Sequence, residues 1–354
     1  MAMKGVATMK DVAAVAGVSK STVSHVINGT RFVEEETKLR VQRAIDELGF
    51  VPSAAARSLT TKRSQALGVV IGDVANQFFS ELLQGVEATV RSHDYSLIVC
   101  NTSENLELED HYIRLLLRQK VDGIIAMATS QNWASVAEAQ ARHMPIVFVD
   151  RAFPGLEDQR FVGVDNARGA YMAAEHLTGL GHRRIGVLAG AQGLSTMRER
   201  LAGFHQALRD HGIPLPDEWI VPSPLSAAAG HAAANQLLTG RERPTALFIA
   251  NNYLTLGALL SLRENGLRCP ADLSIVGFDD HPWAAVTQPP LTVIRQPAMR
   301  IGATAGQMIL DSIEGNEPEQ RKVLFECELV IRESCRALPG GIPGANEGVR
   351  QMSP

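Results

Sequence analysis

The stretch Met9–Leu59 reads MKDVAAVAGVSKSTVSHVINGTRFVEEETKLRVQRAIDELGFVPSAAARSL, and it decides how the N-terminal part of the chain folds. It predicts two short helices joined by a tight turn at Gly17-Val18, since glycine readily takes the positive φ at which helices commonly end. Ser19 is expected to cap the second helix with its hydroxyl group. That helix is apolar on one side and polar on the other. Such a helix suits insertion into the major groove of DNA.

The patterns AxxAGVSxxTVSxVIN and SHVINxTRFVxEET are similar to the N-terminal headpiece of the LacI/GalR family of bacterial transcription repressors, most of all its purine and ribose repressors. An ordinary helical hairpin is the alternative, because helix-turn-helix patterns alone give many false positives. The likeness continues to Ser58-Leu59, which favours the DNA-binding interpretation. The resemblance implies that the headpiece contacts double-stranded DNA through Thr8, Lys10, Ser19, Lys20, Ser21, Thr22, Ser24, His25, Asn28, Thr30 and Arg31.

Glu34–Leu48 is expected to form a third helix that closes the small core, because Leu39, Val41, Ala44, Ile45 and Leu48 recur with a period near 3.6. Residues 1–50 are therefore assigned to an all-α helix-turn-helix domain.

Residues 51–64 form the next segment, which is too short for a stable isolated helix and by itself indicates a flexible linker. The family resemblance implies a hinge helix that folds when two chains meet on DNA. An exposed leucine can wedge into the minor groove and kink the duplex. The residues expected to contact DNA here are Ala55, Ala56, Arg57 and Leu59.

From residue 65 onward, short apolar runs alternate with amphipathic segments. This pattern predicts parallel sheets with helices on both faces. Strands are expected at 67–71, 96–100, 123–127, 146–149, 185–188, 247–250 and 274–278, and later at 292–295 and 324–332. The expected fold is an α/β core of two doubly wound parallel-sheet subdomains. The N-subdomain is assigned to residues 65–163 and 293–322, the C-subdomain to 164–292 and 323–338, and residues 339–354 to a disordered tail.

The same core resembles the effector domain of the LacI/GalR family and, through it, the periplasmic sugar-binding proteins. The motifs VDGIIA, PIVFVDR, GHRRIGVLAG, RLAGF, RPTALFIANN, LSIVGFDD and PPLTVIRQP match in type and order. Ligands of such sheets bind beyond the carboxyl ends of the strands. The expected effector-binding residues are Phe78, Phe79, Asp150, Arg151, Thr196, Arg198, Arg200, Asn251, Asp279 and Trp283. Each could instead serve only as a core residue, a cap or an ion-pair partner.

Two positions depart from the purine repressor: Leu194 stands where it has a purine-contacting arginine, and Leu225 where it has a stacking aromatic ring. A third departure is Tyr253, which replaces the acid usual in the family's NDxxA motif. Asp, Arg and aromatic side chains suit a polyhydroxylated ligand. We therefore expect a sugar or sugar acid as effector, with a phosphate left open by the arginines.

Composition and charge further restrict the class of protein, its cofactors and its location. The chain has 354 residues and a net charge of −4, but residues 1–63 carry a net charge of +4, which leaves −8 for the rest. A basic terminus on an acidic body is typical of a DNA-binding module. The four cysteines have no metal-like spacing, and we expect no metal or cofactor. The sequence has no apolar run of the ~18–20 residues that a membrane span needs. We therefore expect a cytoplasmic, nucleoid-associated protein, and we expect it to be a homodimer.

Two other classes of protein were weighed. An enzyme on a Rossmann-like fold would need a G-x-G-x-x-G after a strand, and neither that pattern, nor G-x-x-x-x-G-K-[ST], nor H-E-x-x-H occurs in the sequence. A solute-binding protein would share the α/β body but lacks a reason for the basic helix-turn-helix. The sequence therefore favours a ligand-regulated, DNA-binding repressor that is not an enzyme.

Overall fold

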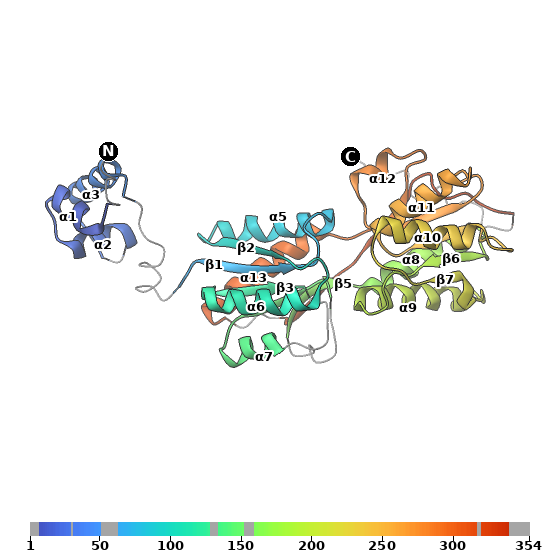
Figure 1. Cartoon of the computed structure of the whole chain (residues 1–354), viewed down its shortest axis with the longest axis horizontal. Helices are drawn as coiled ribbons and strands as arrows, with labels where there is room; N and C mark the ends of the chain where they lie inside the picture. The colour runs from blue at the N-terminus through green and yellow to red at the C-terminus, as the bar shows by residue number, and fades with distance from the viewer. Residues whose placement is uncertain are drawn as a thin grey trace. The chain divides into compact units, whose positions relative to one another are not determined.

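The computed structural model describes residues 7–29, 31–50, 63–127, 134–151, 159–316 and 320–339, which fall into two compact units (Figure 1). The first contains an all-α headpiece, with helices α1 (Met9–Ala16), α2 (Lys20–Asn28) and α3 (Glu35–Leu48). The second is an α/β core. The hinge residues 51–62 and the tail residues 340–354 lie outside the described residues.

Local sequence signals set the ends of the headpiece helices, and those at Gly17 and Ser19 are as expected. Thr8 and Asp11 form a reciprocal capping box at the start of α1, and Gly17 ends that helix with φ +64°. The hydroxyl of Ser19 caps α2 by accepting a hydrogen bond from the amide of Thr22 at 3.0 Å. The three helices then close over one small apolar core, made of Val12, Ala13, Ala16, Val23, Val41 and Ala44.

One expected core residue of the headpiece is exposed. Leu39 keeps 53% of its accessible surface, whereas Val41 and Ala44 are buried. Leu39 precedes Val41 by two residues, which places it about 200° around the helix and away from the buried stripe. The prediction that Leu39 belongs to the core was therefore wrong.

The core holds two lobes, each built on a six-stranded sheet with helices on both faces (Figure 1). In the N lobe the strand order is β11-β5-β4-β3-β1-β2. Helices α5 and α13 pack on each other over one face of this sheet. The elements of the N lobe are β1 (Ala66–Ile71), α5 (Gln77–Arg91), β2 (Ser96–Asn101), α6 (Leu106–Gln119), β3 (Gly123–Ala126), α7 (Ala134–Ala141), β4 (Ile146–Val149), β5 (Arg160–Val164), α13 (Ala298–Glu314) and β11 (Lys322–Phe325).

The C lobe repeats this plan with the strand order β12-β10-β9-β8-β6-β7, in which β12 is antiparallel to β10. Helices α8 and α9 form one packed pair and α10 and α11 the other. The elements of the C lobe are α8 (Asn166–Gly179), β6 (Ile185–Leu188), α9 (Ser195–Asp210), a 3-10 turn (Asp217–Trp219), β7 (Ile220–Val221), α10 (Ala227–Leu238), β8 (Ala246–Ile249), α11 (Asn252–Glu264), β9 (Ser274–Phe278), α12 (Pro282–Val286), β10 (Thr292–Arg295) and β12 (Glu328–Val330). The predicted pair of doubly wound subdomains is confirmed.

The chain passes between the lobes three times, after β5, after β10 and after β11. Two predicted boundaries were wrong by a few residues. Residues 293–295, assigned to the N-subdomain, belong to β10 of the C-lobe sheet, and 323–325, assigned to the C-subdomain, belong to β11 of the N-lobe sheet. The single strand predicted at 324–332 is two strands in different sheets, because the chain crosses between lobes at Glu326-Cys327.

Two general features bear on the class of protein. Among the described residues no helix is long and apolar enough to span a bilayer. Within those same ranges no group of three or more His, Cys, Asp or Glu side chains could hold a metal ion. All four cysteines are free thiols.

Candidate functional site

The first candidate site is the outer surface of the headpiece helix α2. This helix buries Val23 and leaves Lys20 and Ser21 exposed, with Thr22, Ser24 and His25 partly exposed. The hydroxyl groups of Ser19, Ser21 and Thr22 form a cluster, with Ser19 Oγ 2.7 Å from Ser21 Oγ and 2.8 Å from Thr22 Oγ1. Hydroxyls of this kind donate to phosphate oxygens, and they both donate to and accept from base edges.

Other predicted DNA contacts surround α2 or lie beyond the described residues. Thr8, Lys10 and Arg31 are exposed. The hydroxyl of Thr8 also donates to the carboxylate of Asp11 at 2.7 Å, so it stabilises the start of α1. The side chain of Asn28, and Thr30, Ala55, Ala56, Arg57 and Leu59, fall outside the described part of the chain.

The second candidate site is a cavity between the two lobes of the core. It encloses about 50 Å³ and is lined from both lobes. Eight of the ten predicted effector residues meet in its wall: Phe78, Phe79, Asp150, Arg151, Thr196, Arg200, Asn251 and Asp279. The rings of Phe78 and Phe79 lie edge to face, with centroids 5.1 Å apart. The structure therefore brings together side chains from α5, α9 and several strand ends.

Three carboxylate residues of this wall sit on left-handed backbone. The φ angles are +60° at Glu104, +64° at Asp150 and +77° at Asp279. Such conformations are uncommon for residues with a side chain and cost of order 1–3 kcal/mol each. Backbone strain of this kind concentrates at functional sites, where it holds a side chain in a required direction. The strain supports the assignment of this cavity as a ligand site.

Charge is dense in the cavity and largely compensated within it. Arg151 donates two parallel hydrogen bonds to the carboxylate of Glu104, at 2.5 and 2.8 Å, and is 4% exposed. Such bidentate pairs are among the stronger polar contacts in proteins. Burial raises the pKa of Asp150 to about 6, against the opposing effect of Arg151 and Arg200. Asp150 thus changes its charge close to neutral pH.

Arg200 is held in place by its neighbours and faces the same cavity. Its Nε donates to Asn166 at 2.9 Å and its Nη1 to the carbonyl of Ala250 at 2.7 Å. The guanidinium lies 3.6 Å from the ring centroid of Phe278, and burial lowers its pKa from the ordinary value. These contacts fix the cation in the cavity wall, so it would lose little side-chain entropy on binding a ligand.

Asn251 and Asp279 differ in how many hydrogen bonds their side-chain oxygens already accept from the protein. Asn251 caps α11 by accepting from the amides of Tyr253 and Leu254. Asp279 accepts from the side-chain amide of Gln296 at 2.6 Å through Oδ1. A carboxylate can accept several hydrogen bonds, so Asp279 retains capacity for a hydroxyl donor.

Two predicted effector residues do not line the cavity. Arg198 is exposed and donates to the carbonyls of Gln192 and Gly193, because it lies on the side of α9 opposite Thr196 and Arg200. Trp283 packs with Ala284 and Leu291 and stacks on His281, with centroids 5.7 Å apart. The predictions that Arg198 and Trp283 contact the effector are therefore not supported by their placement.

Sequence reasoning missed four polar residues of the wall: Asp73, Asn76, Glu104 and Gln296. Asp73 and Asn76 follow β1, Glu104 follows β2 and Gln296 follows β10. The rule that ligand contacts lie beyond the carboxyl ends of strands would have found all four. Tyr253 also lines the cavity, although the sequence had marked it only as a departure from the family motif.

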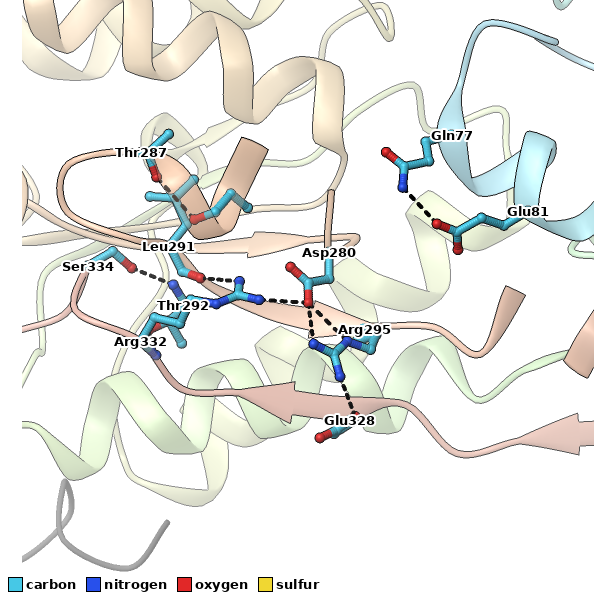
Figure 2. A network of polar contacts seen from close by, with 11 residues as sticks. Gln77, Glu81, Asp280, Thr287, Leu291, Thr292, Arg295, Glu328, Arg332 and Ser334 are labelled. Atoms are coloured by element: carbon cyan, nitrogen blue, oxygen red, sulfur yellow. Dashed lines mark hydrogen bonds and ion pairs between the residues drawn. The ribbon is translucent and has the colours of Figure 1, made fainter. Parts of the chain in front are cut away.

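A second, larger cavity of about 290 Å³ shares Phe78, Asp279 and Gln296 with the first. Figure 2 shows its charged side: Asp280 lies between Arg295 and Arg332, and Arg295 also reaches Glu328, while Gln77 and Glu81 come from α5. Burial alone would raise the pKa of Asp280, but hydrogen bonds from Arg332 and Arg295 hold it below its ordinary value. Arg295 and Arg332 are thus both bound to Asp280. The pair of Arg295 and Glu328 lies where the chain leaves β10 and where it enters β12.

Comparison with known proteins identifies the families to which the two parts of the chain are similar. Residues 8–53 match the bacterial regulatory proteins of the lacI family, and residues 174–335 match the periplasmic binding protein-like domain. The HTH-type transcriptional repressor PurR of Photobacterium profundum is 38% identical over 335 residues, which are 94% of this chain and 99% of that protein.

Solved structures show the same likeness. The Lac repressor dimer bound to operator and the anti-inducer ONPF aligns over 94% of this chain and all of that chain, with a TM-score of 0.84 and 30% identity. The transcriptional regulator CelR in complex with cellobiose aligns over 93% of this chain and 99% of that chain, with a TM-score of 0.72 and 29% identity. The chain belongs to the LacI family of bacterial regulatory proteins, and it is a DNA-binding transcriptional repressor with a small-molecule effector, not an enzyme.

Proposed function

We propose that this repressor binds a near-palindromic operator as a homodimer and responds to a sugar bound between the lobes of its core. Each chain places α2 in a major groove, where Lys20, Ser21, Thr22 and His25 contact bases or phosphates. Leu59 of each chain opens a central base step from the minor groove. The protein acts in the cytoplasm, on the nucleoid, and needs no cofactor beyond its effector.

Exposed apolar side chains on the core support the homodimer. Ile98 and Val99 are exposed on β2, the edge strand of the N-lobe sheet, and Leu256 and Leu260 are exposed on α11 of the C lobe. Natural proteins seldom leave an edge strand with bare aliphatic side chains, since it invites pairing with another chain. We propose that a second copy of the chain covers these residues.

The single observation that carries the sugar proposal is the wall of the cavity between the lobes. Asp150, Asp279 and Arg200 project into one enclosed space beside Phe78 and Phe79. Carboxylates accept from sugar hydroxyls, a guanidinium donates to their oxygens, and aromatic rings pack on the apolar face of a sugar ring. Buried polar groups of this kind discriminate strongly between ligands that satisfy them and ligands that do not.

The charges of the wall favour a neutral sugar over a sugar acid or phosphate. Arg198 lies outside the wall, and Arg151 is already bound to Glu104, so neither is free to pair with an acid. Four carboxylates, from Asp73, Glu104, Asp150 and Asp279, face two arginines. An anion would meet more like charge than opposite charge. We therefore place pentoses and hexoses before sugar acids.

A purine is the second candidate, because of the similarity to PurR repressors. Two residues argue against it. Leu194 is the buried cap residue of α9 and has no donor for a base edge. Leu225 lines the cavity with an aliphatic side chain and offers no ring for stacking. A purine would therefore lack the arginine contact at position 194 and the aromatic stacking at position 225 that the purine repressor provides.

The proposal is tested in two steps with the full-length protein. Duplexes are first selected from a random pool, and the expected winners are near-palindromes. Melting temperature and operator affinity are then measured with D-ribose, D-glucose, cellobiose, D-gluconate and hypoxanthine. A neutral sugar should raise the melting temperature in a saturable way and change operator affinity. A response to gluconate or hypoxanthine alone would contradict the proposed ligand class, and no palindrome preference would contradict the operator proposal.

Asp279→Asn gives the matched test of the cavity. Asparagine tolerates the left-handed backbone at this position but removes the negative charge. The variant should bind the sugar about 10- to 100-fold more weakly, since it loses charge-assisted hydrogen bonds. Operator affinity without sugar should stay within about twofold of wild type. Asp272→Asn is the control, because that carboxylate pairs with Arg268 outside the cavity.

A further inference from the structure

The two lobes of the core are joined by direct side-chain hydrogen bonds at the wall of the cavity of about 50 Å³, here called the inner cavity. The hydroxyl of Tyr253, at the start of α11, donates to Asp73 Oδ2 of the N lobe at 2.6 Å. The amide of Asn252 donates to Asn76 Oδ1 at 2.9 Å. These contacts link a C-lobe helix start to an N-lobe helix start.

His281 extends this row of contacts. Burial lowers its pKa from the ordinary value, so the ring is neutral at pH 7 and one nitrogen is an acceptor. Asn252 donates to Nε2 of His281, and Nδ1 of His281 lies 3.1 Å from Gln77 Oε1. Gln77 in turn donates to Glu81 at 2.7 Å, as Figure 2 shows. The lobes therefore meet through a row of direct side-chain hydrogen bonds.

The space behind this row is small. The inner cavity encloses about 50 Å³, whereas pockets for small organic ligands commonly hold roughly 300–1,000 Å³. A sugar ring therefore fits into the inner cavity only after the lobes have moved apart. Asp73, Asn76 and Tyr253 themselves line the cavity, so that movement separates the partners of the row.

We infer that Tyr253 and Asp73 form a latch: their hydrogen bond holds the lobes closed, and a sugar enters only after this bond has opened. The inference rests on the proposed sugar site and adds to it that the protein's own side chains compete with the ligand. Among the bonds of the row, this one joins a phenol to a carboxylate, the pairing with the strongest electrostatic component. Burial and the bond to Asp73 raise the pKa of Tyr253 to about 12, so the hydroxyl remains a donor at physiological pH.

The latch predicts that removing one hydroxyl group increases the opening of the lobes. Tyr253→Phe keeps the ring and deletes only the donor. Loss of a hydrogen bond to a charged acceptor should raise the population of the open form about tenfold. Asp73→Asn keeps an acceptor without the charge, so its effect should be smaller.

Opening can be measured without any ligand by following a thiol placed in the cavity wall. Thr196 is 2% exposed and lines the cavity, so in Thr196→Cys the thiol reacts with 5,5′-dithiobis-(2-nitrobenzoate) only when the lobes part. Adding Tyr253→Phe should speed this reaction about tenfold. The parent protein gives the background from its four native cysteines. If Thr196→Cys disturbs the fold, Met197→Cys probes the same wall.

Tyr171→Phe is the matched control. Its hydroxyl donates to Asp210 at 3.1 Å, and both residues belong to the C lobe, so the same kind of bond is removed within one lobe. This control should leave the thiol rate unchanged. If Tyr253→Phe leaves the reaction rate of the Thr196→Cys thiol unchanged, the latch is overturned. It is also overturned if this thiol already reacts as fast as an exposed thiol when Tyr253 is intact.

Sugar binding gives a second readout that separates the latch from the proposed function. If a sugar from the panel binds, Tyr253→Phe should lower its dissociation constant about tenfold, since less closed form must be opened. If no sugar binds to either protein, the proposed effector class fails, while the thiol rates still decide the latch.

Discussion

Two buried histidines make the stability of the C lobe depend on pH. His176 on α8 is 8% exposed and His182 is fully buried, and burial lowers the pKa of each to about 4. The unfolded chain takes up these protons near pH 6.5, but the folded core does so only near pH 4. Stability is therefore complete above pH 6.5 and is lost as the pH falls. Each histidine costs about 2 kcal/mol at pH 5.

Asp150 acts in the opposite direction. Its pKa of about 6 in the folded core lies above the ordinary 3.8, so between these values the folded chain holds a proton that the unfolded chain has lost. This offsets about 1.4 kcal/mol of the acid loss at pH 5. The two histidines together exceed that amount, and the core should still be less stable at pH 5 than at pH 7.

His176→Leu tests this account at a single residue. Nε2 of His176 is buried without a hydrogen-bond partner among the described residues, so leucine should be tolerated at pH 7.5. The loss of unfolding free energy between pH 7.5 and 5.0, measured by urea denaturation, should shrink by about 2 kcal/mol. An equal acid loss in variant and wild type would show that His176 does not titrate as proposed.

At the residue scale, the sequence located the site through strand ends and failed where helix geometry decides. Asp150 and Asp279 end buried strands, which marked them as candidates. Arg198 does not line the cavity, because it is two residues from Arg200 and therefore points away from it on α9. The direction of the Arg198 side chain depends on the residue at which α9 begins, and the sequence pattern had not defined that residue.

At the scale of elements, α5 and α13 approach so closely that glycine is required at their contact. A Cβ atom added at Gly302 of α13 would lie 2.0 Å from the carbonyl oxygen of Leu82, and one at Gly85 of α5 would lie 2.2 Å from that of Met299. Backbone carbonyls cannot turn aside as side chains can. Phe78 and Phe79 belong to the first turn of α5, so this close contact supports the helix that carries them into the cavity wall.

Gly302→Ala should separate these helices and lower the unfolding free energy by about 1–3 kcal/mol, the usual cost of overpacking a core. Gly179→Ala is the control, since nothing lies within 4 Å of a Cβ at that helical position. It should be neutral or stabilise the protein by about 0.5–1 kcal/mol, as glycine is a poor helix former. Equal effects of the two substitutions in thermal melts would contradict the close-contact argument.

Strands β5 and β11 show which elements the sequence signals did not reveal. Alternating apolar and amphipathic segments predicted most of both lobes, but no strand was predicted at β5, and β11 was merged with β12 into one strand at 324–332. β5 pairs with β4, which precedes it in the chain, whereas β11 joins β5 from a distant part of the chain. The sheet partner of β11 depends on the path of the whole chain, so local periodicity could not assign it, and the lobe boundaries shifted by a few residues.

At the scale of the whole molecule, affinity for a palindromic operator should depend on the apolar surface of the core. Leu260→Asp places a charge among exposed aliphatic residues of α11 that we propose to be covered by a second chain. By light scattering, the variant should have the mass of one chain rather than two. Operator affinity should fall by about 10²- to 10⁴-fold, because two linked headpieces bind their half-sites with high effective concentration. Leu108→Asp, which alters an exposed leucine of α6, should change neither. A Leu260→Asp protein that stays dimeric would place the interface elsewhere.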